Sequence, residues 1–128
     1  MSEIRPDLKY TAEHEWVYLE GDEATIGITD YAQEQLGDIV FVELPDMNST
    51  VTYMEPFGTI EAVKAANDLF CPVTGEVVDV NGAISDDPAL VNGSPYDEGW
   101  MIKVKITDAK VLEELLSATQ YKEAIGEE

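Results

Sequence analysis

One lysine, Lys64, lies in a sequence context that suits covalent chemistry. It is among only seven basic residues in a chain of formal net charge −20, and its direct neighbours are Val63 and Ala65. The nearest acids, Glu61 and Asp68, lie on either side and not next to it. An amine among small apolar neighbours and without an adjacent acid is accessible to an acylating enzyme. The alternative is an ordinary solvated lysine, which is the usual state of this residue type.

The segments on either side of Lys64 determine how it is presented. Residues 57–60 and 69–71 are short apolar runs, typical of β-strands, and residues 76–80 form a third such run. Two strands separated by so short a segment predict a β-hairpin with Lys64 at its tip. Glu61 and Asp68 would then flank the tip.

The rest of the chain predicts more strands and a few helices. A capped helix is expected over residues 31–36, because Thr29 or Asp30 can begin it and Gly37 can end it. Residues 83–99 are rich in Asp, Pro, Asn and Gly and predict a long loop with at most one helical turn. Further strands are predicted at 16–20, 24–28, 38–44 and 100–106, and helices at the C-terminus, where Ser117 and Gln120 have the spacing of a capping box.

These elements indicate a mostly β fold in a single domain, residues 1–128. A Gly-acid-apolar-apolar pattern occurs at residue 37 and again at residue 75, which suits two β units packed face to face. We therefore expect a small β-sandwich or flattened barrel with a short internal helix and C-terminal helices. The residues predicted to form its core include Trp16, Ile39, Phe41, Trp100 and Ile102.

Charge and composition exclude several classes of protein. With 27 acidic residues against seven basic ones, the surface repels nucleic-acid backbones and anionic membranes. A single cysteine, Cys71, forms no internal disulfide and is expected to be buried. Residues 1–7 contain neither an apolar run nor a basic amphipathic stretch, so the sequence predicts no signal or transit peptide and a cytoplasmic location.

The sequence offers little for catalysis. His14 is the only histidine, which excludes zinc sites that need two or three imidazoles, and we expect it to be structural. Paired carboxylates are so frequent in this acidic chain that they carry almost no information. A small acid-catalysed enzyme remains an alternative, and it would require an activity of the unmodified protein that survives Lys64→Arg.

Several blocks of the sequence, in order, resemble the glycine cleavage system H-protein family. The block around the lysine is Glu-Ala-Val-Lys-Ala-Ala at 61–66, and the others lie at 10–17, 27–33, 36–45, 92–96 and 99–100. Ala62 stands where the family pattern usually has serine. Asn48 replaces a glycine that is common after the strand ending at Leu44 and Pro45, and asparagine can adopt the same left-handed backbone.

The resemblance implies a lipoyl-domain type of fold and a non-catalytic carrier with lipoic acid in amide linkage to Lys64. It implies that Glu61 and Gly75 help to present the hairpin to the lipoate-attaching enzyme; Gly75 would avoid a clash or adopt a positive φ. A biotin carrier also has its lysine at a hairpin tip, but biotin-accepting tips usually have methionine on both sides of the lysine. Here those neighbours are Val63 and Ala65.

The resemblance further implies three enzyme partners. A pyridoxal-phosphate glycine decarboxylase would load an aminomethyl group, a folate-dependent aminomethyltransferase would remove it, and dihydrolipoyl dehydrogenase would reoxidise the carrier. Glu15 and Asp68 are hypothesised to line a cleft for the loaded arm and to pair with its ammonium; the alternative is two solvated acids. The alternative to this carrier is an H-like protein that serves as a lipoyl donor or scaffold for other lipoate-dependent enzymes, and its sequence pattern can be nearly the same. A monomer is expected, because a permanent interface would compete with the enzymes.

Overall fold

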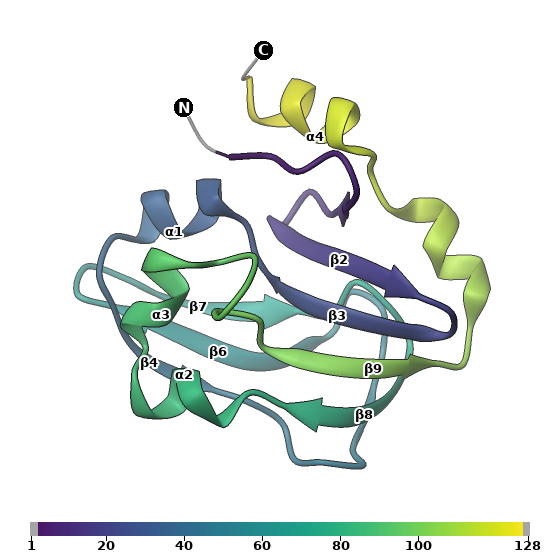
Figure 1. Cartoon of the computed structure of the whole chain (residues 1–128), viewed down its shortest axis with the longest axis horizontal. Coiled ribbons are helices and arrows are strands. Elements are labelled where there is room, and N and C mark those ends of the chain that lie inside the picture. The colour runs from purple at the N-terminus through teal and green to yellow at the C-terminus, as the bar shows by residue number, and fades with distance from the viewer. Residues whose placement is uncertain (1–2, 127–128) are drawn as a thin grey trace.

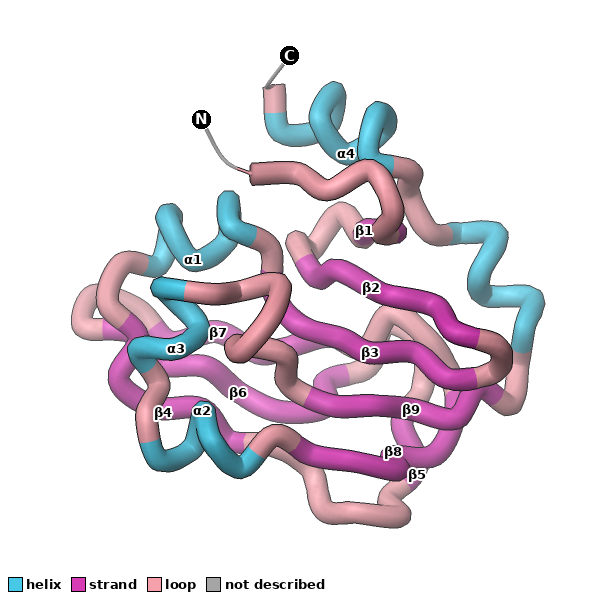
Figure 2. The backbone as a smooth tube through the Cα atoms, in the orientation of Figure 1, coloured by secondary structure: helices cyan, strands magenta, loops and turns pink. Residues whose placement is uncertain are grey.

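Two antiparallel β-sheets build the molecule, as a computed structural model of residues 3–126 shows (Figure 1, Figure 2). The larger sheet has the strand order β1-β2-β3-β9-β8-β5, and the smaller has the order β4-β6-β7. The strands are β1 (Lys9–Tyr10), β2 (Glu15–Glu20), β3 (Glu23–Ile28), β4 (Ile39–Glu43), β5 (Thr50–Val51), β6 (Pro56–Ala62), β7 (Ala66–Phe70), β8 (Gly75–Val80) and β9 (Ile102–Ile106). The predicted sandwich is confirmed, and the sheets do not close into a barrel.

Short helices lie around the sheets (Figure 1). They are α1 (Asp30–Leu36), α2 (Gly82–Asp86), α3 (Ala89–Gly93), the 3₁₀ helix η1 (Ala109–Glu114) and α4 (Ala118–Ile125). None of the helices within residues 3–126 is long and apolar enough to span a bilayer.

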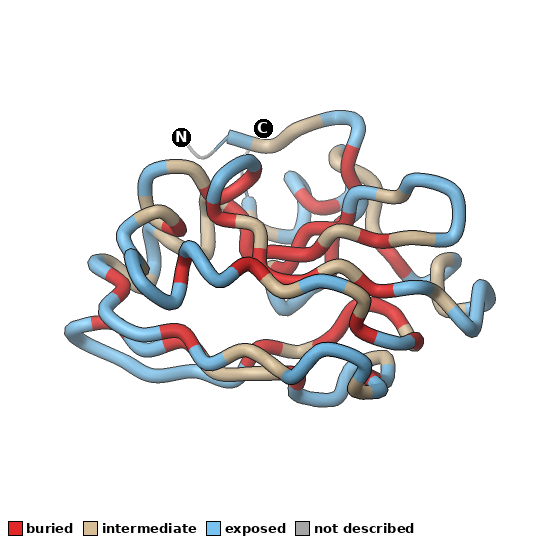
Figure 3. The backbone as a smooth tube through the Cα atoms, turned by 60° about the horizontal axis from the view of Figure 1, so that its bottom comes forward, coloured by how far each residue is buried: buried red, intermediate tan, exposed pale blue. Residues whose placement is uncertain are grey.

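The main core fills the space between the two sheets. Ile26 of β3, Ile60 of β6 and Val77 of β8 are almost fully buried, and each comes from an apolar-polar alternation along its strand. Buried segments lie mostly in the interior of the molecule, whereas the outer parts of the backbone are mostly exposed or half-buried (Figure 3). Burial of one face of each sheet fixes the strand register, because a shift by one residue would turn the apolar side chains to solvent.

A second, aromatic cluster joins the two ends of the chain. The rings of Tyr10 on β1 and Tyr121 on α4 are stacked, with 4.7 Å between their centroids. Helix α4 begins at the predicted capping box, in which the Ser117 hydroxyl accepts the Gln120 amide and the Gln120 side chain accepts the Ser117 amide. The C-terminal helix is thus held against β1 by packing and by its own cap.

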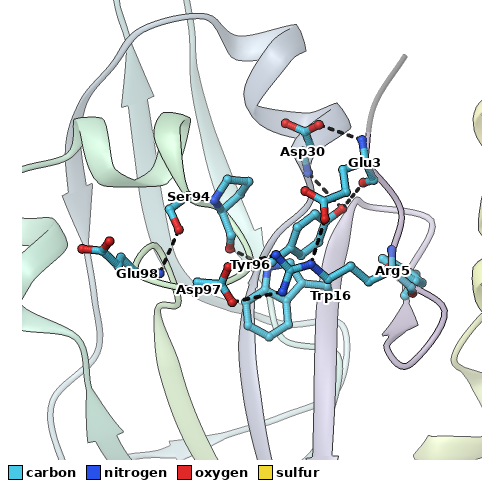
Figure 4. Close-up of polar contacts among 10 residues, drawn as sticks. Glu3, Arg5, Trp16, Asp30, Ser94, Tyr96, Asp97 and Glu98 are labelled. Atoms are coloured by element: carbon cyan, nitrogen blue, oxygen red, sulfur yellow. Dashed lines mark hydrogen bonds and ion pairs between the residues drawn. The ribbon is translucent and has the colours of Figure 1, made fainter.

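The N-terminal segment is tied to the loop before β9 (Figure 4). Arg5 donates two hydrogen bonds to the carboxylate of Asp97, and its guanidinium lies 4.9 Å from the centre of the Tyr96 ring. The Tyr96 hydroxyl donates to the Glu3 carbonyl and accepts the Asp30 amide at the start of α1. One loop therefore connects the N-terminal segment with helix α1.

Three details of the predicted elements are wrong. The predicted loop at 83–99 contains two short helices, α2 and α3, which place Ile84 and Val91 in the core. Phe41 is 48% exposed and outside the core, and Trp100 is only half-buried. The predicted start of α1 is confirmed, because Thr29 caps the helix by accepting the Ala32 amide.

The longer strands lie close to their predicted positions, whereas the two-residue strands β1 and β5 are not among those predicted from the sequence. Trp16, Ile39 and Ile102 are buried, as expected. Asn48 has a φ of 68°, so it does adopt the left-handed backbone for which glycine is usually chosen.

Candidate functional site at the Lys64 hairpin

Lys64 occupies the turn between β6 and β7, which pair in antiparallel register with Glu61 opposite Ala66. The Ala62 amide donates to the Ala65 carbonyl at 2.7 Å and closes the turn. The Val63 amide donates to the Asp38 carbonyl at 3.1 Å and fixes the turn to the segment before β4. The backbone at the tip is thus held from two sides.

The side chain of Lys64 is free at this fixed tip. It is exposed, and within residues 3–126 the ion pairs are those of Arg5 with Glu3 and Asp97, so the ammonium of Lys64 has no carboxylate partner there. The flanking acids Glu61 and Asp68 are also exposed. The structure therefore presents an unpaired primary amine on a turn that is held by two backbone hydrogen bonds.

An open cleft of about 640 Å³ lies beside the hairpin. Its walls come from three separate parts of the chain: the turn and start of β2, helix α1, and the strands β6 and β7. The lining residues are Glu13, His14, Glu15, Ile28, Ala32, Gln35, Leu36, Thr59, Ile60, Glu61, Ala66, Asn67, Asp68, Leu69 and Phe70. The structure thus brings Glu15, Asp68 and Glu61 to one cavity at the base of the Lys64 turn.

Glu15 and Asp68 have different environments in this cleft. Glu15 is 2% exposed, and the Thr11 hydroxyl donates to its Oε1 at 2.7 Å. Burial raises the pKa of Glu15 to about 8, so its carboxyl group is mostly protonated at pH 7. Asp68 is exposed on β7. Glu15 and Asp68 thus differ in character, because one is a buried and the other a solvated hydrogen-bond acceptor.

His14 also lines the cleft, which sequence reasoning did not foresee. Its backbone is left-handed, with a φ of 72°, and its Nδ1 lies 2.8 Å from the Tyr121 hydroxyl. Burial lowers the pKa of this imidazole, so the ring is neutral at pH 7. Within residues 3–126 no three His, Cys, Asp or Glu side chains gather as metal ligands. A structural role, as predicted, suits the hydrogen bond to Tyr121.

Gly75 lies in the other sheet, at the start of β8, and not on the hairpin. A Cβ there would lie 2.0 Å from the Lys105 carbonyl oxygen on the paired strand β9, so the position has no room for a side chain. Its φ is not positive, which rules out the second reason considered for this glycine. Gly75 therefore has a packing role, and its effect on lipoylation stays a prediction.

Cys71 follows the hairpin directly and is fully buried, as predicted. Burial raises the pKa of its thiol to about 12, so at neutral pH this cysteine is not a nucleophile. The exposed amine of Lys64 is the chemically available group in this part of the molecule.

Comparison with known proteins identifies the family of this chain. The family model described as glycine cleavage H-protein matches residues 8–128. The chain belongs to this family. Curated H proteins of the glycine cleavage system include that of Halalkalibacterium halodurans, which is 55% identical over 128 residues and covers 100% of both chains. That of Staphylococcus carnosus is 55% identical over 124 residues, 97% of this chain and 98% of its own.

The H-protein fold is also confirmed by a solved structure. The crystal structure of a glycine cleavage system H protein from Mycobacterium marinum superposes with a TM-score of 0.89 at 41% sequence identity. The match covers 96% of this chain and 99% of the mycobacterial one. The two sheets, the hairpin and the helices described above are therefore those of an H protein.

Proposed function

We propose that this protein is the lipoylated carrier of the glycine cleavage system. It takes the aminomethyl group of glycine from the pyridoxal-phosphate glycine decarboxylase to the folate-dependent aminomethyltransferase, and dihydrolipoyl dehydrogenase reoxidises it. The single observation that supports this most is the unpaired amine of Lys64 on a hydrogen-bonded hairpin beside an open cleft, in a chain of the H-protein family.

The residues at the tip fit a lipoyl group in amide linkage to Lys64. The amine has no ion pair to break, and its neighbours Val63 and Ala65 are exposed and small or medium-sized, so they leave room for an attaching enzyme. A lipoyl group supplies a disulfide that can accept an aminomethyl unit while it is reduced. The protein supplies the fixed turn that presents this group.

Recognition by the lipoate-attaching enzyme is proposed to depend on the shape of the hairpin. Glu61 is exposed and lies opposite Ala66, in the residue pair of β6 and β7 that is nearest to the turn. An enzyme that approaches Lys64 can therefore contact it. Gly75 acts at a distance, because it allows β8 and β9 to pair closely within the larger sheet.

Within the cleft, Glu15 and Asp68 are proposed to receive the ammonium of the loaded arm. A cation next to Glu15 favours the carboxylate over the neutral acid, so the buried acid releases its proton when the cation enters. The resulting pair is protected from water on the Glu15 side by the buried first half of strand β2. This arrangement delays hydrolytic loss of the one-carbon unit between enzymes.

The chain itself carries out no chemical step in this proposal, and it works as a monomer in the cytoplasm. Its contribution is tethering: once the carrier docks, a group linked to Lys64 meets the enzyme at a high effective concentration. The strong negative charge assists docking at basic entrances of the partner enzymes.

Reconstituted glycine decarboxylation tests the proposal. We expect lipoylated wild-type protein to support glycine-dependent release of CO₂ and Lys64→Arg to support none. Lys110→Arg is the matched control, because Lys110 is an exposed lysine on η1, outside the hairpin, and it should behave as wild type. Full activity of Lys64→Arg would contradict the proposal. Lipoylated protein that fails with the decarboxylase but passes lipoyl groups to other enzymes would favour the donor alternative.

A further inference from the structure

The hydroxyl of Tyr121 lies between two walls of the cleft. It is 2.8 Å from Nδ1 of His14 and 2.8 Å from Oγ1 of Thr29. His14 belongs to the wall formed by the start of β2, and Thr29 is the N-cap of α1, the helix that forms the adjoining wall. Tyr121 itself is fully buried on α4 and does not line the cleft.

Both partners of the Tyr121 hydroxyl are connected to the lining of the cleft, because His14 is itself a lining residue and Thr29 contacts another. Oγ1 of Thr29 also accepts the amide of Ala32, which is a lining residue of α1. The Thr29 amide donates to the His14 carbonyl at 3.0 Å, so the backbones of the two walls are already joined. The Tyr121 hydroxyl adds the side-chain link, which sets the direction of the His14 ring and of the N-cap oxygen.

His14 is a residue that needs such a link. Its left-handed backbone, with a φ of 72°, is uncommon for a residue other than glycine and holds the turn before Glu15 in a particular shape. The ring of His14 contacts the ring of Tyr31, a residue of helix α1, at a centroid distance of 5.0 Å. The His14 ring therefore connects the turn before Glu15 with helix α1 through side-chain packing.

We propose that Tyr121 is a positioning residue for the cleft: through its hydroxyl, the C-terminal helix sets the separation between the His14 turn and helix α1. This inference rests on the proposed function of the cleft as the shelter of a loaded arm. It adds a role for α4, a helix that contributes no lining residue. Loss of the hydroxyl widens the cleft and shortens the lifetime of the sheltered group, while the fold persists.

The chain contains a close control for Tyr121→Phe. Tyr10 is stacked on Tyr121, is equally buried, and its hydroxyl likewise makes two hydrogen bonds, with the amide and the carbonyl of Arg5. Tyr10→Phe therefore removes a buried hydroxyl from the same ring pair on the side away from the cleft. The two variants should lose similar amounts of global stability. A difference between them in the breakdown of the loaded protein would therefore reflect the position of the removed hydroxyl.

The experiment uses full-length lipoylated protein loaded with the aminomethyl group, and measures its spontaneous breakdown. Because the two hydrogen bonds of the Tyr121 hydroxyl, to His14 and Thr29, are lost, we expect breakdown about fivefold faster in Tyr121→Phe and within about twofold of wild type in Tyr10→Phe. In unloaded protein, hydrogen exchange of the Ala32 amide should be faster in Tyr121→Phe alone. The imidazole nitrogen signals of His14, the only histidine, should shift in that variant only.

Equal breakdown and equal exchange in Tyr121→Phe and wild type would overturn the inference. Equal acceleration in Tyr121→Phe and Tyr10→Phe would overturn it too, since general loosening would then explain the effect. If loaded wild-type protein is no more stable than a free aminomethyl thiol, the shelter function fails. The exchange and imidazole measurements on unloaded protein would still decide whether Tyr121 positions the walls.

Discussion

Glu15 and Lys64 owe their chemical character to opposite environments. Lys64 is exposed and unpaired on a fixed turn, which keeps its amine available. Glu15 is buried at the wall of the cleft, which keeps its carboxyl group mostly neutral until a cation approaches. An available amine and a buried acid beside one cleft are what a carrier with a sheltered cationic load requires.

The raised pKa of Glu15 predicts that stability falls with rising pH. Folding raises this pKa from 4.5 to about 8, so the folded state binds the extra proton between these values. Stability from this group is complete below pH 4.5 and is lost as pH rises through about 8. Glu15→Gln removes the titration and keeps an acceptor for the Thr11 hydroxyl. As the pH rises from 5 to 9, the unfolding free energy of the wild-type protein should therefore fall by about 2–4 kcal/mol relative to that of Glu15→Gln.

Urea unfolding across this pH range provides the measurement. Glu20→Gln is the control, because Glu20 is an exposed acid on the same strand β2, and its difference from wild type should stay nearly constant with pH. A Glu15→Gln difference that is equally flat would show that Glu15 is ionised in the folded protein.

At the level of elements, strand β4 explains why one core prediction was wrong. Its pairing with β6 shifts register between Ile39 and Phe41, which is a β-bulge at Val40. A bulge places two neighbouring side chains on the same face, and Val40 and Phe41 are 56% and 48% exposed. Burial of Phe41 was predicted only from its apolar side chain. The bulge that exposes this side chain arises from the pairing of β4 with β6, which the sequence of β4 does not show.

Two alanine substitutions on β4 should therefore have different effects. Ile39 is 4% exposed, and Ile39→Ala leaves a cavity in the core, so we expect it to lower the unfolding free energy by about 2–4 kcal/mol. Phe41→Ala removes a half-exposed ring and should cost less than about 1 kcal/mol. Equilibrium unfolding in urea measures both. A larger loss for Phe41→Ala than for Ile39→Ala would mean that the bulge is not as described.

Local patterns were sufficient for most elements but not for α2 and α3. Hairpins, the capping boxes and strand alternation depend on near neighbours, and Ser117 with Gln120 formed the predicted box. The loop-like composition of 83–99 hides two short helices, which form because Ile84 and Val91 are buried and the Asn81 side chain accepts the Ala83 amide. Such tertiary burial overrides weak helix propensity.

At the level of the whole molecule, the cleft was only partly predictable. The resemblance placed Glu15 and Asp68 in one cavity, and both do line it. The contribution of His14 and its contact with Tyr121 link residues 107 positions apart, and no local pattern shows such a contact. The cleft exists because three separate segments meet, which is a property of the assembled sheets and α1.

The overall charge predicts how the carrier meets its enzymes. With a net charge of −20, the association that we propose with glycine decarboxylase should be steered by long-range attraction. Its rate constant should fall about tenfold or more between low salt and about 0.5 M KCl, while the dissociation rate constant changes much less. Stopped-flow fluorescence can follow both. An association rate that is independent of salt would mean that the acidic surface has another purpose.

The carrier role itself depends on one covalent bond, and intact-mass measurement with peptide mapping examines that bond directly. In protein purified from its native host, or lipoylated by the attaching enzyme, we expect a mass increase of one lipoyl group that maps to Lys64 and is absent from Lys64→Arg. An unmodified Lys64 under both conditions, or a lipoyl group on another lysine, would contradict the account.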